Sequence, residues 1–347
     1  MPEANSHTEW GQLQEVIVGI AHNAQIPRVK NKDIHCVDYA NYDSLDHIQD
    51  LTYSDRVLKE TQEDLDRFAE QLQAMNIMVH RPVPLDLQRK YQSPHWETDG
   101  YYQYCPRDIA LVVGDTIIET PMVLRSRYFE AQGLQPIFHE YFVQGSNWVS
   151  APKPCLHDEL YDRSNLDSNT LTETEIAFDA ANVIKCGKDL FYLVSNSGNV
   201  MGAKWLQRQL GSDYRIHVLT DIYAYVHLDT SIMPLAPGKV LMNPSRVNDN
   251  NMPNYFKNWD IIWAPEPIET PCDDKLASAS PWLSMNVLSI NEHTVVVEER
   301  QQPLIDLLES QGFDVMPVKM RHCRTLSGGP HCVTLDTVRK DKFEDFS

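Results

Sequence analysis

Several features that would assign this chain to a class are missing from its 347 residues. No uninterrupted apolar run reaches about 18 residues, so we expect no membrane span and no membrane partner. The opening stretch MPEANSHTEW is polar, and it lacks the basic and then apolar layout of a secretion signal. We therefore expect a protein that stays in the cytoplasm.

Positive charge is scarce. The chain has 30 lysines and arginines against 49 aspartates and glutamates, which gives a net charge of -19. A nucleic-acid footprint requires a basic face, so we expect no nucleic-acid partner. We attribute the acidic surface first to solubility, although the same charge would attract a cationic ligand.

Cysteine occurs seven times, an odd number, and never in a CxxC pair. This spacing argues against a disulfide framework and against a zinc ribbon, and we expect no metal site. Most of the cysteines are expected to be small buried hydrophobic residues. A glycine-rich phosphate loop is missing as well, which argues against a doubly wound nucleotide-binding sheet.

What the chain contains is a unit that recurs five times: a strand or hairpin, a stretch of helix, and a short apolar strand. The clearest copy has two apolar runs within 286–299, an amphipathic helix from Pro303 to a stop at Gly312, and a strand at 313–318. The first strands or hairpins of the other copies are predicted at 15–20, 109–121, 182–195 and 228–244. Their helices are predicted from Leu58 to Met75, onward from Leu124, at 203–211 and near Tyr255, and their last strands at 77–82, 147–152, 214–219 and 259–265.

Five such units have a closed arrangement. Because one unit cannot bury its own apolar face, a ring of five removes the exposed edges between them. We therefore predict a single α/β domain over residues 1–347, with cyclic pseudosymmetry, helices outside and strands near a central channel. A doubly wound sheet is the alternative. Residues 30–55 and 155–175 carry no pattern and are predicted to be surface loops.

The most informative segment for chemistry is Ser327-Gly-Gly-Pro-His-Cys332. Two glycines before the His-Cys pair let the backbone approach a ligand closely, and they place Cys332 on an irregular segment. A nearby imidazole or cationic ligand would raise the thiolate fraction of a cysteine, whose free pKa is about 8.5. Local sequence leaves two interpretations open, a nucleophile or a buried cysteine after a glycine turn.

Two further motifs contain a histidine or a carboxylate suited to proton transfer or cation binding. His227 and Asp229 alternate within a predicted strand, so both side chains would point to one face. The plainer interpretation of His227 is a polar histidine on an edge strand. Asp179 either caps a turn, which its local sequence favours, or pairs with a planar cation.

Asp108 and Arg246 lie at the ends of predicted strands. Asp108 precedes the hairpin of the second unit, as Asp179 precedes the hairpin of the third. Arg246 follows the hairpin of the fourth unit, where an exposed arginine would clamp a carboxylate. A purely structural interpretation is open for both residues.

Taken together, these motifs resemble the arginine amidinotransferases, a family that includes glycine amidinotransferase and inosamine-phosphate amidinotransferase. The resemblance extends from the EWGQLQEVIVG opening to the C-terminal cysteine, and stretches such as ETDGYYQYCPRD and IIETPMVLRSRYFE are most similar to the inosamine-type branch. Its five ordered motifs are FDAAN (178–182), HLD (227–229), NPSR (243–246), WLSMN (282–286) and SGGPHC (327–332).

The resemblance implies a fold and a set of roles. The fold would be a five-bladed α/β propeller of the pentein type, with pseudo-fivefold ββαβ repeats around a central channel. Cys332 would be the nucleophile, His227 the general acid and base, and Asp179 the carboxylate partner of that histidine. Asp108 and Asp229 would hold the guanidinium group of arginine.

The resemblance also implies contacts with the far end of arginine and with the acceptor. Arg246 would bind the α-carboxylate of arginine. Ser280 falls where the family has a substrate-contacting serine, although its surroundings, DDKLASASPW, match poorly. In glycine-using members an asparagine lies three residues before the histidine, where this chain has Ala224, and a small residue there fits a bulkier acceptor.

The implied reaction moves the amidino group of L-arginine through a covalent amidino-cysteine to an amine, releases L-ornithine, and requires no cofactor. The partners we expect are L-arginine and an amine acceptor, which is left open among an inosamine, lysine and another diamine. Assembly is left open between a monomer and a homodimer. A guanidine hydrolase that uses water, as arginine deiminase does, is the alternative function. A non-enzymatic ribosome-associated factor on the same fold would not need the GG-x-H-C segment.

Overall fold

The computed structural model describes residues 2–29, 31–33, 52–164, 168–270, 272 and 276–347. Within these residues, the strands form five three-stranded sheets and one short hairpin. In every three-stranded sheet, the central strand pairs antiparallel with one neighbour and parallel with the other. A parallel pair needs a crossover connection, and in each unit a helix lies within it.

The five sheets and their crossover helices have these bounds. The first contains β17 (Thr334–Lys340), β1 (Gln12–Val18), α1 (Asp55–Ala74) and β2 (Met78–His80). The second contains β5 (Ala110–Val113), β6 (Thr116–Glu119), α2 (Gln135–Gln144) and β7 (Asn147–Ser150). The third contains β8 (Val183–Cys186), β9 (Asp189–Leu193), α3 (Val200–Leu210) and β10 (Arg215–Leu219). The fourth contains β11 (Ile232–Ala236), β12 (Lys239–Met242), a 3₁₀ helix (Asn254–Asn258) and β13 (Asp260–Trp263). The fifth contains β14 (Leu288–Ser289), β15 (Thr294–Glu298), α4 (Gln302–Ser310) and β16 (Asp314–Val318).

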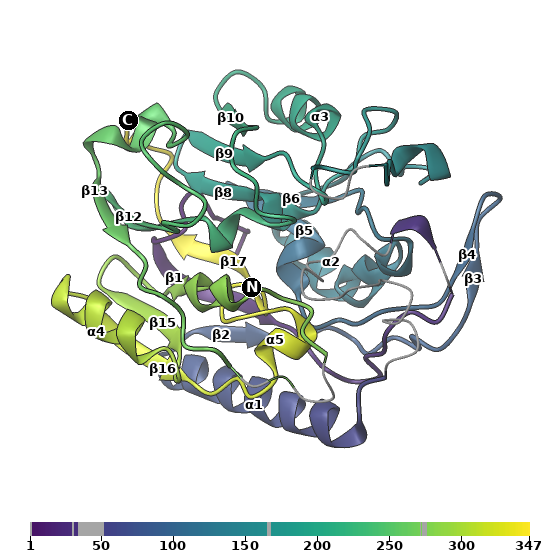
Figure 1. Cartoon of the computed structure of the whole chain (residues 1–347), viewed down its shortest axis with the longest axis horizontal. Helices are drawn as coiled ribbons and strands as arrows, with labels where there is room; N and C mark the ends of the chain where they lie inside the picture. Colours follow the sequence, from purple (N-terminus) through teal and green to yellow (C-terminus); the bar gives the residue numbers. More distant parts are fainter. Residues whose placement is uncertain (1, 30, 34–51, 165–167, 271, 273–275) are drawn as a thin grey trace.

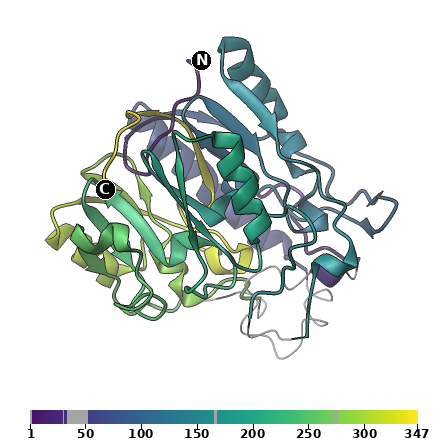
Figure 2. The same cartoon turned by 90° about the horizontal axis from the view of Figure 1, so that it is seen from above.

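Two smaller elements lie outside this repeat. The hairpin of β3 (Tyr91–Gln92) and β4 (Glu97–Thr98) projects from the body of the molecule (Figure 1). Figure 2 shows the molecule from above. The short helix α5 (Cys323–Leu326) precedes the segment that carries Cys332. Helices α1, α3 and α4 lie at the rim, with strands inside (Figure 1).

The predicted units are confirmed in order and type, with local differences. Three hairpins turn at a glycine with positive φ, namely Gly114, Gly187 and Gly238, a conformation that most other residues adopt only with strain. The helix predicted onward from Leu124 begins as two 3₁₀ turns, and regular α-helix starts only at Gln135, where a proline follows at the first turn. The helix predicted near Tyr255 is 3₁₀.

The first unit takes its antiparallel strand from the other end of the chain. β1 pairs with β17, with Val18 opposite Thr334 and Leu13 opposite Arg339. The repeat in the sequence places no hairpin before residue 15, because the partner strand is more than 300 residues away. The two ends of the chain are thereby joined in one sheet.

The hydrophobic core consists of five clusters, and each contains strands of two units. Ile17 of the first unit packs in a cluster with Ile117 of the second. Similar clusters combine the second with the third unit, the third with the fourth, and the fourth with the fifth. The last cluster combines Val296 of the fifth unit with Val16 of the first. Successive units therefore bury one another's apolar faces.

The five sheets stay separate, and no closed sheet runs through the described residues. The protein is thus a mixed α/β structure. Most of the loop predicted at 30–55 lies outside the described residues. The loop predicted at 155–175 contains a 3₁₀ turn (Asp158–Leu160) and a bridge between Tyr161 and Leu171, and residues 165–167 lie outside the described residues. No helix in the described part of the chain combines the length and apolar character needed to cross a bilayer.

Candidate active site

One side chain from each unit lies just before the strand that begins the unit, and these five side chains come together. They are Asp108, Asp179, Asp229, Asn286 and Cys332. The first four lie at or beside short 3₁₀ turns, and these turns contact one another. Each of the five residues is at most 3% exposed. The repeat that builds the fold therefore also builds a buried polar cluster.

Asn286 holds the backbone around Cys332. Its Oδ1 accepts hydrogen bonds from the backbone N–H groups of His331 (3.0 Å) and Cys332 (2.9 Å), and its Nδ2 lies 3.0 Å from the Cys332 Sγ. A Cβ atom on Gly329 would lie 2.8 Å from the Asn286 side chain, so only glycine allows this approach. At Gly329, the close approach predicted from the sequence is made to the protein's own asparagine rather than to a ligand.

Asp229 lies between the thiol and a second histidine. Its Oδ2 accepts a hydrogen bond from Asn286 Nδ2 (2.7 Å), and it lies 2.9 Å from His331 Nδ1 and 3.4 Å from Cys332 Sγ. Burial alone would raise the pKa of Asp229, but the hydrogen bond and charge of His331 lower this pKa below its usual value. Asp229 therefore stays charged beside the thiol.

His227 lies between two carboxylates. Its Nε2 is 3.3 Å from Asp179 Oδ2, and its Nδ1 is 3.7 Å from Asp108 Oδ1. Burial would lower the pKa of His227, but the charge of Asp108 and hydrogen bonds with Asp179 and Cys332 raise this pKa well above its usual value. The imidazole is therefore protonated at neutral pH, with a proton available for a leaving group.

Two local predictions for these residues are wrong. His227 and Asp229 do not lie in a strand: His227 precedes a 3₁₀ turn (Leu228–Thr230), and the two side chains reach the cluster by that turn. Asp179 does not cap its turn through its side chain, because its carboxylate faces His227 instead. Burial raises the pKa of Asp179, and the hydrogen bond with His227 opposes this rise.

The three aspartates leave oxygens ready for a further donor. The Oδ1 atoms of Asp108, Asp179 and Asp229 are buried and accept no hydrogen bond from the protein. A buried carboxylate oxygen without a donor is unfavourable, so such oxygens are uncommon unless a ligand supplies the donor. A planar group with several N–H donors and a positive charge fits three such acceptors.

Asp108 is held in place by a buried arginine that the sequence did not single out. Arg127 Nη1 donates to Asp108 Oδ2 at 2.6 Å, and its Nε and Nη2 donate to Glu130 at 2.7 and 3.0 Å. The guanidinium also lies 4.8 Å from the centre of the Tyr102 ring. Burial raises the pKa of Glu130 to about 7, although Arg127 opposes this rise. Arg127 thus positions one oxygen of Asp108 and leaves the other free.

The thiol of Cys332 is neutral in this arrangement. Its pKa lies well above the usual value because of a hydrogen bond with Cys105, burial, and the negative charge of Asp229. The hydrogen bond with His227 acts in the opposite direction. A cation that neutralised the surrounding carboxylates would favour the thiolate.

Arg246 and Ser280, predicted to contact substrate from separate motifs, lie together. Arg246 Nη2 donates to Ser280 Oγ at 3.2 Å, and its Nη1 donates to Thr230 Oγ1 at 2.8 Å and to Ser231 Oγ at 3.3 Å. Thr230 and Ser231 directly follow Asp229 in the chain. The guanidinium of Arg246 is therefore connected to the polar cluster, and it is part-buried rather than exposed as predicted.

Ala224 lies in the interior. It is 1% exposed and packs in the hydrophobic cluster of the third and fourth units, with Ile222 and Leu228. The expectation that this position forms the edge of an acceptor pocket stays a prediction. The neighbouring Tyr223 and Tyr225 are part-exposed, and Tyr225 has a positive φ of 62°.

Sequence reasoning missed several residues of the cluster. His331 and Asn286 occurred in quoted motifs without a role, and Arg127 lies in the stretch LRSRYFE, which was noted only for its similarity. Cys105 lies in the quoted stretch ETDGYYQYCPRD and was given no role. A usable signal was position: Asn286 precedes the first strand of its unit, as the three aspartates do.

Comparison with known proteins places the chain among enzymes of one kind, although no protein-family model matches it. It is 46% identical over 341 residues to inosamine-phosphate amidinotransferase 1 of Streptomyces glaucescens, which covers 98% of both chains. It is 38% identical over 350 residues to the L-arginine:L-lysine amidinotransferase of Pseudomonas savastanoi pv. phaseolicola, covering 98% of this chain and 96% of that one.

Solved structures agree with the sequence relatives. The inosamine-phosphate amidinotransferase of Streptomyces griseus superposes with a TM-score of 0.96 at 46% identity, over 99% of each chain. DDAH from Pseudomonas aeruginosa superposes with a TM-score of 0.60 at 13% identity, over 93% of this chain and 99% of that one. The second likeness concerns the fold alone.

Proposed function

The chain belongs to the amidinotransferase family, and on that premise we propose that it transfers the amidino group of L-arginine through Cys332 to an amine, releasing L-ornithine. One observation carries the proposal. Three buried aspartate oxygens without a donor lie in one cluster with a cysteine thiol and with a histidine whose pKa is raised. A guanidinium group supplies donors and positive charge to such a set, and it brings its central carbon to the sulfur.

The donor would be held at both ends. Asp108 and Asp229 take the guanidinium, and Asp179 keeps its role as the carboxylate partner of His227. Arg246, with Ser280 beside it, takes the α-carboxylate of arginine through paired hydrogen bonds. The closeness of these residues supports the roles that the resemblance implies for them.

Arginine itself would activate the nucleophile. Without a cation, the pKa of the Cys332 thiol is well above its usual value. A bound guanidinium neutralises the charge of Asp229 at 3.4 Å from the sulfur, so the thiolate forms only when the donor is in place. The carboxylates also hold positive charge near the central carbon, which otherwise is a poor electrophile because its charge is delocalised.

Two substitutions at one carbon complete the reaction. When arginine binds, the Cys332 thiol releases its proton to solvent. The sulfur then bonds to the guanidinium carbon, the bond from that carbon to the side-chain nitrogen of arginine breaks, and His227 donates a proton to the leaving ornithine. The acceptor amine then bonds to the same carbon, gives a proton to His227, and expels the thiolate, which takes up a proton again when the product leaves. Nothing is oxidised or reduced, the scheme needs no cofactor or metal, and it predicts ping-pong kinetics.

The acceptor in this proposal is an aminocyclitol amine or an amino-acid amine such as lysine. This choice of acceptor rests on two relatives, which are named for inosamine phosphate and for L-lysine. The segment from Tyr223 to Val226 precedes His227 directly, so its part-exposed side chains are the nearest candidates for acceptor contacts. The second candidate is the loop 272–281, which includes Ser280 and matches the family poorly, and part of this loop lies outside the described residues.

We also propose that the five units form a five-bladed propeller around the polar cluster. The five core clusters, which combine successive units and then the fifth with the first, support this arrangement. A cytoplasmic location stays a prediction, and assembly stays open between a monomer and a homodimer.

The decisive experiment incubates the protein with L-arginine alone and then adds a panel of amines. We expect intact mass spectrometry to find one amidino group on Cys332, ornithine to appear with arginine alone, and a guanidino product to appear on addition of the right amine. Cys332→Ala should lose the adduct and the activity while keeping its melting temperature. Citrulline in place of ornithine would identify a hydrolase, and transfer by the Ala variant would exclude the covalent scheme.

A further inference from the structure

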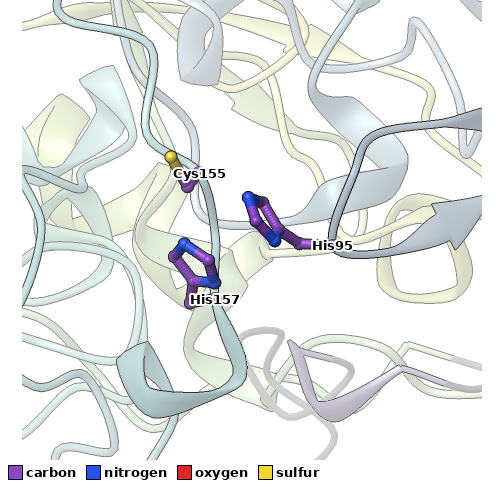
Figure 3. Close-up of side chains that lie close together, drawn as sticks. All are labelled: His95, Cys155 and His157. Atoms are coloured by element: carbon purple, nitrogen blue, oxygen red, sulfur yellow. The ribbon is translucent and has the colours of Figure 1, made fainter.

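Three metal-binding side chains meet on the surface, apart from the catalytic cluster. His95 lies in the turn of the β3–β4 hairpin, while Cys155 and His157 lie in the segment that follows β7 (Figure 3). One potential ligand atom from each residue lies within 4.8 Å of the others, and all three side chains are exposed or part-exposed. Two segments some 60 residues apart in the sequence therefore offer two imidazoles and one thiol to the same point.

The segment with two of these residues is held in place by a carboxylate. Glu175 accepts hydrogen bonds from the backbone N–H groups of Cys155, Leu156 and His157, at 2.5, 3.3 and 3.0 Å. Leu156 is fully buried with a positive φ of 53°, and Arg125 donates to its carbonyl oxygen at 2.6 Å. Leu156 thus anchors the segment in the core, and it leaves the two flanking side chains at the surface.

The hairpin is fastened to the same segment. Trp96, next to His95, donates through its indole N–H to the carbonyl oxygen of Cys155 at 2.8 Å. Ser93 Oγ accepts the backbone N–H groups of His95 and Trp96, both at 3.1 Å, which fixes the hairpin turn. The rings of His95 and His157 lie 3.9 Å apart, centre to centre. The three side chains are therefore brought together by contacts of their backbones and neighbours.

We propose that His95, Cys155 and His157 form a binding site for a divalent transition-metal ion of the zinc class. Thiolate and imidazole are the ligands that such ions prefer, whereas magnesium and calcium prefer oxygen. Zinc binds sulfur at about 2.3 Å and nitrogen at about 2.0–2.1 Å. The three ligand atoms must therefore move about 1 Å closer to one another to share one ion, and exposed side chains can do so by rotation about their χ angles. A water molecule takes the fourth position of a tetrahedron.

The bound ion would join the hairpin to the segment after β7. Because the ion binds the folded arrangement and not the unfolded chain, it stabilises the folded state, and the stabilisation grows as the free ion concentration rises above the dissociation constant. The site shares no residue with the catalytic cluster, so its test does not depend on the proposed transfer reaction.

The test uses the full chain with Cys332→Ala, which removes the buried thiol that would also bind metal. We expect one equivalent of Zn²⁺ by isothermal titration calorimetry, a higher melting temperature with Zn²⁺, and sulfur-to-metal charge-transfer absorption with Co²⁺. Adding His95→Ala, Cys155→Ser or His157→Ala should weaken binding at least about tenfold, and Cys155→Ser should abolish the Co²⁺ band.

The matched control is His293→Ala, which removes an exposed histidine from another turn and should leave binding unchanged. The proposal would be overturned if the three site variants bound Zn²⁺ as tightly as the Cys332→Ala protein does, or if the Co²⁺ absorption survived Cys155→Ser. A protein that binds no Zn²⁺ in the Cys332→Ala background would overturn it as well.

Discussion

At the scale of single residues, the chemistry of Cys332 depends on the charges placed around it. Asp229 lies 3.4 Å from the sulfur and raises the thiol pKa, while Asp179 acts on His227 and makes no contact with the sulfur. The two aspartates look alike in the sequence, since each precedes the first strand of a unit. Their effects on the thiol should differ.

This difference is testable by alkylation. Asp229→Asn removes a negative charge beside the sulfur, so the pKa of Cys332 should fall, and iodoacetamide should react faster at neutral pH. The same variant should lose about 10–100-fold in kcat/KM for arginine, because a charged acceptor for the guanidinium is gone. The pH dependence of the alkylation rate gives the thiol pKa. Asp179→Asn is the control, and a similar fall of the thiol pKa there would contradict the assignment.

Arg127 offers a second test at this scale. Its guanidinium holds Asp108 and Glu130 at once, and an ammonium group cannot reproduce those directed hydrogen bonds. Arg127→Lys keeps the charge, yet kcat/KM for arginine should fall by about 10–100-fold because Asp108 is no longer positioned. Steady-state kinetics and thermal unfolding, measured on the same preparation, decide the point. A loss of activity that only follows the folded fraction would show a structural role instead.

At the scale of elements, the active cluster is built from short turns that repeat once per unit. The 3₁₀ turns before β5, β8, β11 and β14 present three aspartates and one asparagine, and the turn before β17 presents the cysteine. Because the turns contact one another, a shift in one of them displaces a side chain of the next. The segment after α5 is tightly constrained, since Gly329 passes Asn286 at close range.

Gly329→Ala tests this constraint. The new Cβ would lie 2.8 Å from Asn286, whose oxygen holds the backbone of Cys332, so Cys332 should move. A misplacement of about 1 Å is enough to cost about 100-fold in kcat/KM. Gly312→Ala is the matched control: its φ is +88°, no atom lies within 4 Å of the new Cβ, and the expected cost is about 1–2 kcal/mol of stability without loss of activity per folded molecule. Equal activities of the two folded variants would exclude the packing argument.

At the scale of the whole molecule, a buried charge network joins three units beneath the cluster. Asp336 of β17 accepts from Arg107 (2.7 Å), Lys185 of β8 (3.0 Å), Arg339 (2.8 Å) and Ser6 (2.6 Å). The charges of the three cations lower the pKa of Asp336 well below its usual value, although burial opposes this. The carboxylate is thus the common anion of the network.

Asp336→Asn should therefore destabilise the protein strongly. Three buried cations would lose their shared anion, and breaking a buried pair in this way costs about 3–5 kcal/mol. Because the folded-state pKa is depressed, the stabilisation is fully present above the unfolded pKa of about 3.9, and it is lost as the pH falls through the folded-state pKa. Urea unfolding gives the free energy of unfolding of the variant and of the unsubstituted protein. The difference between these two free energies should be smaller in acid than at neutral pH. Glu97→Gln, at an exposed ion pair with Lys90, should have little effect at either pH.

Much of the fold was predictable from local pattern. Four hairpins and most helices were predicted from signals that involve only residues close together in the sequence. These signals are the apolar periodicity, the proline that opens α4 and the glycines of the hairpin turns. Cys332 was predicted as a nucleophile from its motif and its family resemblance, not from its surroundings. The family itself followed from five ordered motifs and is confirmed by a relative that is 47% identical over 334 residues.

Only the tertiary structure decided which groups face one another. The pairing of β1 with β17 joins residues more than 300 positions apart. Local sequence favoured a cap for Asp179 and a strand for His227, but the contact between them replaced both predictions, since a buried carboxylate gains more from an imidazole than from a turn amide. The cysteine spacing excluded a zinc ribbon, yet it carried no information about His95, Cys155 and His157, because their meeting depends on a hairpin and a loop from distant segments. The sequence by itself determined the repeating unit and the reactive residue types, and the packing of five units determined the charges and distances on which their chemistry depends.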